Sequence, residues 1–132
     1  ARIRLDDGMR SGVWPAFWMM GNDIENGAPW PYCGEIDIME HRNAEKQIIS
    51  TLHWNRGTGT SASNAHEYLG SEITNQYGNI DSINDWHDYA VEWYEDVMKF
   101  YLDGVCFETL NINNSEMEEF QKEHFMFTVW TL

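Results

Sequence analysis

Three acidic side chains lie within six residues of an otherwise apolar run, Gly34-Glu35-Ile36-Asp37-Ile38-Met39-Glu40-His41. Glu35 and Asp37 are two residues apart, so an extended strand places both on one face. Glu40 points to the opposite face of a regular strand, but one extra residue near Ile38 and Met39, a β-bulge, turns it back. The spacing therefore predicts three carboxylates on one surface. At neutral pH such a group is unfavourable unless a proton or a cation is shared.

Glycoside hydrolysis is one chemistry that fits this pattern, because it uses two carboxyl groups on either side of the scissile bond. Glu35 and Glu40 in a bulged strand are about four strand steps, roughly 13 Å, apart at the backbone. Side chains that lean together over a bent strand could reach the separation of about 5–5.5 Å of retaining enzymes, or the 6.5–9.5 Å of inverting ones. Asp37 lies between them and is expected to orient a glutamate and to separate the two pKa values.

Two other interpretations of the carboxylates remain open at this point. Together with His41 or His53 they could bind Ca²⁺ or a transition metal. They could also form a solvated acidic strand face. The apolar residues between them argue against the solvated face, because a strand with this pattern should be buried on its other side.

The rest of the chain reads as short strands separated by turn signals, which predicts an antiparallel all-β sandwich. The alternation of apolar and polar residues and the apolar runs predict strands at residues 1–5, 13–21, 34–41, 47–54, 66–73, 86–93, 97–102, 105–110 and 125–132. Asp103-Gly104 is the strongest hairpin signal. Residues 22–31 are expected to be a loop and residues 116–122 a short helix, which Asn113-Asn114-Ser115 could cap.

Three tryptophans and one histidine are candidates for substrate contact. Trp14 and Trp18 lie in the apolar run before the carboxylates, where packing in the core is the alternative. Trp30 lies on a loop, and ligand contact and packing are equally good explanations there. If residues 47–54 pair antiparallel with the carboxylate strand, His53 lies toward the start of that strand. A hydrogen-bonded structural role is the alternative for His53.

The 132 residues suit a single domain, and their composition restricts its partners. The 22 acidic and 8 basic residues give a formal net charge of −14, which argues against nucleic acid and favours a neutral substrate. No apolar run approaches the roughly 20 residues of a membrane span. Cys33 and Cys106 are too few for a disulfide framework and are expected to be buried free thiols.

Glu35-Ile36-Asp37-Ile38-Met39-Glu40 resembles the Glu-x-Asp-x-x-Glu signature of glycoside hydrolase family 16, in its bulged, laminarinase-like form. Further segments resemble that family in the same order along the chain. They are Gly12-Val13-Trp14-Pro15-Ala16-Phe17-Trp18, Trp30-Pro31-Tyr32-Cys33-Gly34, Thr51-Leu52-His53, Trp86-His87-Asp88-Tyr89-Ala90-Val91-Glu92-Trp93 and Phe100-Tyr101-Leu102-Asp103-Gly104.

The resemblance implies a concanavalin A-like β-jelly roll with a substrate cleft across its concave sheet. It implies a retaining endo-glycosidase acting on β-1,3 or mixed β-1,3/1,4 glucans, with Glu35 as nucleophile, Asp37 as assisting carboxylate and Glu40 as general acid/base. It also assigns cleft or sugar-stacking positions to a further set of side chains, Trp14, Trp18, Trp30 and His53.

The family's catalytic domains are longer, so we expect this sandwich to be incomplete at both ends and the chain to be part of a longer enzyme. We expect no cofactor in the chemistry. A structural calcium in the full domain would use ligands that this sequence does not identify. The family suggests an extracellular or periplasmic monomer. A non-catalytic, lectin-like carbohydrate-binding module and a family 16 enzyme acting on a galactan are the alternative functions.

Overall fold

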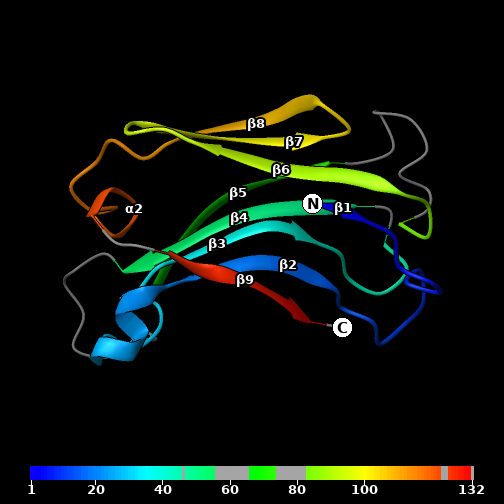
Figure 1. Cartoon of the computed structure of the whole chain (residues 1–132), viewed down its shortest axis with the longest axis horizontal. Coiled ribbons are helices and arrows are strands. Elements are labelled where there is room, and N and C mark those ends of the chain that lie inside the picture. The colour runs from blue at the N-terminus through cyan, green and yellow to red at the C-terminus, as the bar shows by residue number, and fades with distance from the viewer. Residues whose placement is uncertain (46, 56–65, 74–82, 123–124, 132) are drawn as a thin grey trace.

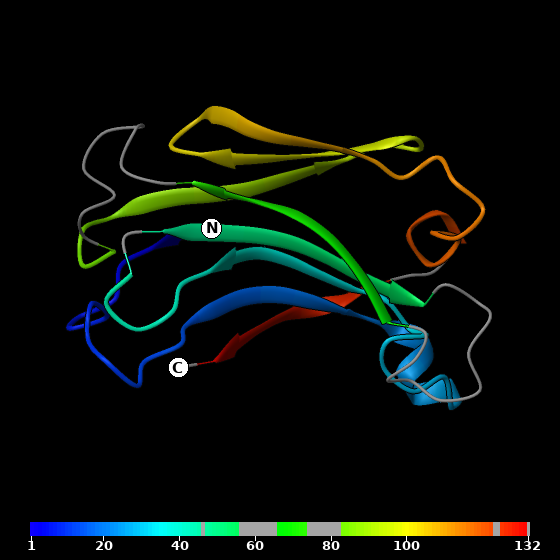
Figure 2. The ribbon, with the colours of Figure 1, turned by 180° about the vertical axis from the view of Figure 1, so that it is seen from behind.

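Two antiparallel sheets lie face to face in the computed structural model, which describes residues 1–45, 47–55, 66–73, 83–122 and 125–131 (Figures 1 and 2). One sheet has the strand order β5 (His66–Ile73), β4 (Ile48–Asn55), β3 (Glu35–Glu40), β2 (Ala16–Gly21) and β9 (Phe125–Thr131). The other has the order β1 (Arg2–Ile3), β6 (His87–Trp93), β7 (Val97–Leu102) and β8 (Val105–Asn111). The predicted all-β sandwich of two antiparallel sheets is confirmed.

Most predicted strands form with their ends moved by a few residues. The predicted strand 13–21 begins only at Ala16, because Pro15 lacks a backbone N–H. Pro15 instead accepts a hydrogen bond from the amide of His41 at 3.1 Å. The first strand is confined to Arg2 and Ile3, which pair with β6. Asp103 and Gly104 have φ values of 49° and 79°, as the predicted hairpin turn requires.

Two segments between strands differ from the prediction. The expected loop 22–31 contains a 3₁₀ helix, η1 (Asn22–Asn26), which ends at Gly27 with a φ of 94°. The helix expected over residues 116–122 is only one turn, α2 (Glu119–Lys122). Asn114 caps the turn before it, because its side-chain oxygen accepts a hydrogen bond from the amide of Glu116 at 2.7 Å. No helix among the described residues has the length and apolarity needed to cross a membrane.

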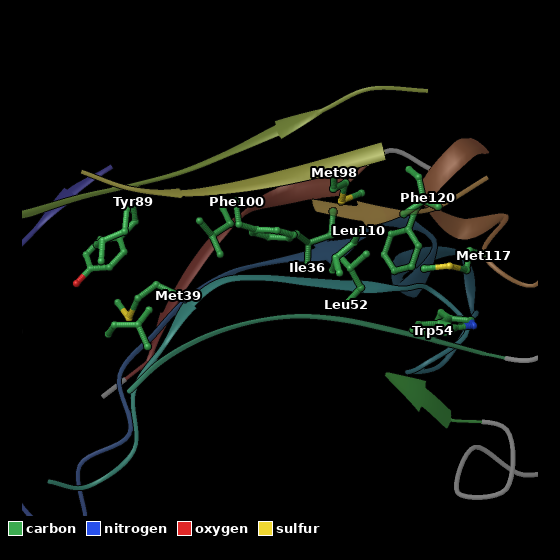
Figure 3. Packing of buried hydrophobic residues seen from close by; sticks show 14 of the residues in the cluster. Ile36, Met39, Leu52, Trp54, Tyr89, Met98, Phe100, Leu110, Met117 and Phe120 are labelled. Atoms are coloured by element: carbon green, nitrogen blue, oxygen red, sulfur yellow. The ribbon is translucent and has the colours of Figure 1, made fainter. Parts of the chain in front are cut away.

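The core fills the space between the two sheets (Figure 3). From β3 and β4 come buried apolar side chains, Ile36, Ile38, Met39, Ile48, Leu52 and Trp54. The opposite sheet contributes Tyr89, Met98, Phe100, Leu102 and Leu110, and Met117 and Phe120 close one end. Burial of this apolar surface is the main force that holds the sheets together. Side chains that alternate with these on β3 and β4 therefore face away from the core.

The two cysteines have different surroundings, and one prediction for them is wrong. Both are free thiols, and Cys33 is buried as expected. Cys106 is exposed. It lies on β8 at the edge of its sheet, opposite Tyr101, on the side that faces solvent. The apolar neighbours of Cys106 in the sequence do not reveal which face of an edge strand it occupies.

Candidate active site

A β-bulge at Ile38 places the third carboxylate on the same face as the other two. Trp18 on β2 pairs with Asp37 on β3, and the adjacent Phe17 pairs with Met39, so Ile38 is the extra residue. Ile38 and Met39 are both buried in the core. The next residue, Glu40, therefore returns to the face away from the core, as its spacing predicts.

The strand register shows how far apart the bulge leaves the two glutamates along the neighbouring strands. Glu35 pairs with Met20 and Glu40 with Ala16, four positions apart on β2. Their partners on β4, His53 and Ile49, are likewise four positions apart. Asp37 pairs with Trp18, midway between Met20 and Ala16. Asp37 therefore lies between the two glutamates on the face of the five-stranded sheet that is turned away from the core. The ribbon of this sheet is concave on the side away from the four-stranded sheet (Figures 1 and 2).

Each glutamate accepts a hydrogen bond from a tryptophan that lies outside the strands. Trp30 donates its indole N–H to Glu35 Oε2 at 2.5 Å. Trp14 donates to Glu40 Oε1 at 3.0 Å. These rings also remain open to solvent, with 55% of Trp14 and 36% of Trp30 exposed. Trp14 and Trp30, both predicted site residues, therefore contact the carboxylates directly.

The other two predicted site residues contact Asp37 from the neighbouring strands. Trp18 lies on β2, is half-buried and pairs with Asp37 of β3. His53 lies opposite Glu35 on β4, and its Nε2 is 3.0 Å from Asp37 Oδ2. This is a close polar contact without good hydrogen-bond alignment, since Oδ2 is a buried oxygen that receives no hydrogen bond among the described residues. The predicted position of His53 near the start of the carboxylate strand is confirmed.

Burial and mutual repulsion raise the pKa values of the two central carboxyl groups. Burial, followed by the charge of Asp37, raises the pKa of Glu35 to about 7, although His53 and the Trp30 hydrogen bond oppose the shift. Burial and then the charge of Glu40 raise the pKa of Asp37 to about 8. Asp37 is only 2% exposed and is the more buried of the two, so it is the group that retains a proton at neutral pH. The site can thus hold Glu35 ionised beside a protonated Asp37.

The entry into the carboxylate strand is fixed by a close backbone contact. A Cβ atom on Gly21 would lie 1.5 Å from the carbonyl oxygen of Cys33. The amide of Gly21 donates to the carbonyl oxygen of Gly34 at 3.0 Å. Gly34 itself has a φ of 77° and directly precedes Glu35. Two glycines therefore set the point at which the chain joins β2 and begins to present carboxylates.

Comparison with known proteins identifies the family to which this arrangement belongs. The model of the glycosyl hydrolases family 16 matches residues 1–131. The chain belongs to glycosyl hydrolases family 16. A glucan endo-1,3-beta-glucosidase from Cryptopygus antarcticus is 35% identical over 115 residues, which are 86% of this chain and 39% of that protein. The clotting factor G alpha subunit of Tachypleus tridentatus is 38% identical over 94 residues, 70% of this chain and 12% of that protein.

A solved structure of family 16 gives the same result for the fold. The Bacteroides ovatus mixed linkage glucan PUL GH16, in complex with G4G4G3G product, superimposes with a TM-score of 0.75 at 32% identity. The match covers 98% of this chain and 52% of that structure. This chain therefore spans about half of that family 16 structure.

The candidate site contains one histidine that sequence reasoning missed. His66 begins β5, and its Nε2 lies 2.8 Å from Nδ1 of His53. Its ring centre lies 4.5 Å from that of Trp30. Sequence predicted a strand at residues 66–73 but not its register, and only the register brings His66 beside two other site residues.

Glu35, Asp37 and His53 could also hold a cation. Each offers one donor atom, and these atoms lie within 4.8 Å of one another. The donor set of two carboxylates and an imidazole suits a transition metal better than calcium, which prefers six or more oxygen ligands. His41, the other histidine considered from sequence, is fully buried and contacts the carbonyl oxygen of Glu45 through its Nε2 at 2.5 Å. It is therefore not grouped with these donors.

Proposed function

We propose that this site is the catalytic centre of a retaining endo-glucanase. Its reaction is hydrolysis of internal β-1,3 bonds, or of mixed β-1,3/1,4 bonds, in laminarin-type polysaccharides. The observation that carries the proposal is the bulge at Ile38, which places Glu35, Asp37 and Glu40 on one face. Three carboxyl groups with separate surroundings supply the nucleophile, the acid and the group that controls protonation.

The proposed reaction has two steps. In the first, the Glu35 carboxylate attacks the anomeric carbon while Glu40 donates its proton to the departing glycosidic oxygen, which leaves a glycosyl ester on Glu35. In the second, Glu40 removes a proton from water, and the resulting hydroxyl displaces Glu35 from the anomeric carbon. Glu40 thereby regains its proton, and two inversions at one carbon give net retention.

Asp37 controls the ionisation of Glu35 in this proposal. Because Asp37 is the more buried carboxyl group and has the higher pKa, it holds the proton that the pair would otherwise share. Glu35 is then free to attack as a carboxylate. The indole N–H of Trp30 favours the same charged form of Glu35.

A neutral glucan is the proposed substrate, and the surroundings of the carboxylates support it. Trp14 and Trp30 expose ring surface next to Glu40 and Glu35, where sugar rings can stack, while Trp18 and His53 line the face around Asp37. The net charge of −14 disfavours anionic polymers and nucleic acid. We propose that the enzyme acts as a monomer outside the cytoplasm, in the extracellular space or the periplasm. It needs no cofactor, because the three carboxyl groups suffice for both steps.

The test is release of reducing sugar from laminarin by the full-length protein. Glu35→Gln and Glu40→Gln should each lower kcat by about 10²–10⁴-fold. Glu95→Gln is the matched control, because Glu95 is an exposed glutamate in the turn between β6 and β7 on the other sheet. Activity of Glu35→Gln equal to that of the unmodified protein would refute the assignment. Proton NMR of the first product should show the β-anomer if the mechanism is retaining.

An activated substrate separates the roles of the two glutamates. A dinitrophenyl leaving group needs no protonation, so Glu40→Ala should still form the glycosyl-enzyme from a dinitrophenyl laminari-oligosaccharide. Glu35→Ala should not, because it lacks the nucleophile. The reverse pattern would exchange the two roles.

A further inference from the structure

His66 lies where β5 first joins the edge of the five-stranded sheet. It pairs with Asn55, which is two residues from His53 on β4, so the two histidines are diagonal neighbours on one face. Their ring centres are 5.0 Å apart, and Nε2 of His66 lies 2.8 Å from Nδ1 of His53. The ring of His66 is half-buried. A direct hydrogen bond therefore links the edge strand to a residue that contacts Asp37.

A second contact leads from His66 to the other central carboxylate. The ring of Trp30 lies 4.5 Å, centre to centre, from that of His66 and 6.1 Å from that of His53. Trp30 donates its N–H to Glu35. The three rings form one cluster in which His66 contacts both residues that touch the carboxylates. Its loss would release Trp30 and His53 together.

The hydrogen bond between the histidines also fixes the position of a proton. A neutral imidazole has one donor and one acceptor nitrogen. When His66 donates, Nδ1 of His53 accepts and the proton of His53 resides on Nε2, which faces Asp37 Oδ2 at 3.0 Å. When His53 donates instead, its proton resides on Nδ1, and its Nε2 can accept from the protonated Asp37. In either direction the hydrogen bond to His66 holds His53 in one tautomer.

We infer that His66 is a positioning residue of the candidate active site, which holds Trp30 by ring contact and sets the tautomer and orientation of His53 by a hydrogen bond. The inference rests on the proposed glucanase function for its kinetic consequences. The hydrogen-bonded tautomer itself is a property of the folded protein and is independent of any substrate.

The first test compares His66→Leu with His66→Gln in the full-length protein acting on laminarin. Leu removes the hydrogen bond, whereas the Gln amide can still donate one. His66→Leu should lower kcat by about 10- to 100-fold, as expected for misplaced supporting groups, and His66→Gln should recover most of the loss. His87→Leu is the matched control, because His87 also lies near an aromatic ring and bonds a carboxylate, Asp103 at 2.8 Å, but in the other sheet. It should leave kcat within about twofold, the range of an independent site.

A double-mutant cycle tests whether His66 acts through Trp30. If it does, His66→Leu should cost less in a Trp30→Phe background than in the unmodified protein. The ¹⁵N chemical shifts of the His53 ring supply a readout that does not depend on activity. They should report one predominant tautomer in the unmodified protein and in His66→Gln, and a mixture of tautomers in His66→Leu.

Two outcomes would overturn the inference. One is an unchanged His53 tautomer in His66→Leu. The other is a kcat for His66→Leu within twofold of the unmodified protein, or a loss that simply multiplies with that of Trp30→Phe. If the unmodified protein releases no sugar from laminarin, the proposed function fails, and the ¹⁵N shifts still decide whether His66 positions His53.

Discussion

Asp37 is the residue at which stability and function oppose each other. It is buried between two glutamates, and burial together with the charge of Glu40 raises its pKa from 3.8 to about 8. Between these two values the folded protein holds a proton that the unfolded chain releases. Stability should therefore be full at low pH and be lost as the pH rises through this window. A protein keeps such a group where chemistry requires it.

Asp37→Asn should relieve this cost, because the amide cannot ionise. At pH 8 the variant should be more stable than the unmodified protein, by about 2–5 kcal/mol, whereas at pH 4 the difference should be small. Thermal melting at the two pH values measures the effect. Asp85→Asn removes an exposed carboxylate in front of β6 and is the control. An equal dependence of stability on pH in Asp37→Asn and the unmodified protein would contradict the pKa of Asp37.

The same substitution should change how activity depends on pH. A nucleophilic Glu35 with a pKa of about 7 predicts that kcat/KM rises with pH through neutrality. Burial is the larger cause of that raised pKa and persists in Asp37→Asn, and a protonated Asp37 is as neutral as the amide. The acid limb of Asp37→Asn should therefore stay near pH 7, whereas any change of activity caused by ionisation of Asp37 above about pH 8 should disappear. The residual kcat/KM on laminarin between pH 4 and pH 9 gives the measurement. A clear shift of the acid limb to lower pH would mean that Asp37 is charged while Glu35 titrates.

At the scale of elements, the bulge in β3 decides which carboxylates share a face. In a strand that lacks Ile38, regular alternation from Asp37 would place Met39 toward the core and Glu40 toward the site. The bulge therefore compensates for the one extra residue, Ile38. The pairings of Glu40 with Ala16 and Ile49 need not change. Removal of Ile38 should therefore preserve the face that Glu40 occupies.

Deletion of Ile38 should give a less stable protein that retains measurable activity on laminarin. Deletion of Ile36 removes a residue of the same type and similar burial, but it shifts the alternation between Glu35 and Asp37. That variant should be inactive, because Glu35 and Asp37 can no longer share a face. Each deletion loses one buried side chain, at a cost of about 2–5 kcal/mol. The two variants should therefore have similar melting temperatures. If the variant without Ile36 were active and the variant without Ile38 were not, the faces assigned to Glu35, Asp37 and Glu40 would be contradicted.

Gly21 tests how the loop before β3 is held. A methyl group there would overlap the carbonyl oxygen of Cys33, and backbone atoms cannot move aside as a flexible side chain can. Gly21→Ala should destabilise the protein by about 3 kcal/mol, at the upper end of overpacking costs, and should displace Glu35. Gly12→Ala is a control for loss of a glycine, since nothing lies within 4 Å of a Cβ at that position, although its φ of 86° adds strain. A melting temperature of Gly21→Ala higher than that of Gly12→Ala would refute the close contact between Gly21 and Cys33.

Sequence predicted the features that depend on local spacing. The need for a bulge follows from the separation of five positions between Glu35 and Glu40. The faces of β4 follow from its alternation, with Leu52 in the core and His53 toward the site. Contacts between distant segments could not be predicted in this way. That Trp14 bonds Glu40 depends on the path of the chain before β2, and His66 reaches His53 only through the register of β5. The sequence pattern of an edge strand is also weak, so it does not show that β8 turns Cys106 toward solvent.

At the scale of the whole molecule, charge restricts what can approach the concave face. The chain carries a net charge of −14, and the ionised carboxylate of Glu35 adds its field at the proposed substrate site. A neutral glucan meets no long-range repulsion from this charge, whereas a sulfated polymer does. Such repulsion between exposed charges weakens as salt shortens the Debye length, from about 30 Å at 0.01 M to about 10 Å at 0.1 M.

Laminarin and chemically sulfated laminarin share one backbone, so they isolate the effect of charge. At about 0.01 M salt, kcat/KM on the sulfated polymer should be at least about tenfold lower, and it should recover several-fold at about 0.1 M, while hydrolysis of laminarin should hardly change. Reducing-sugar assays at the two salt concentrations measure both. Bulky sulfate groups could also block binding by their size, but a steric block would not be relieved by salt. Equal hydrolysis of the two polymers at low salt would mean that local basic residues, and not the net charge, govern the approach of substrate.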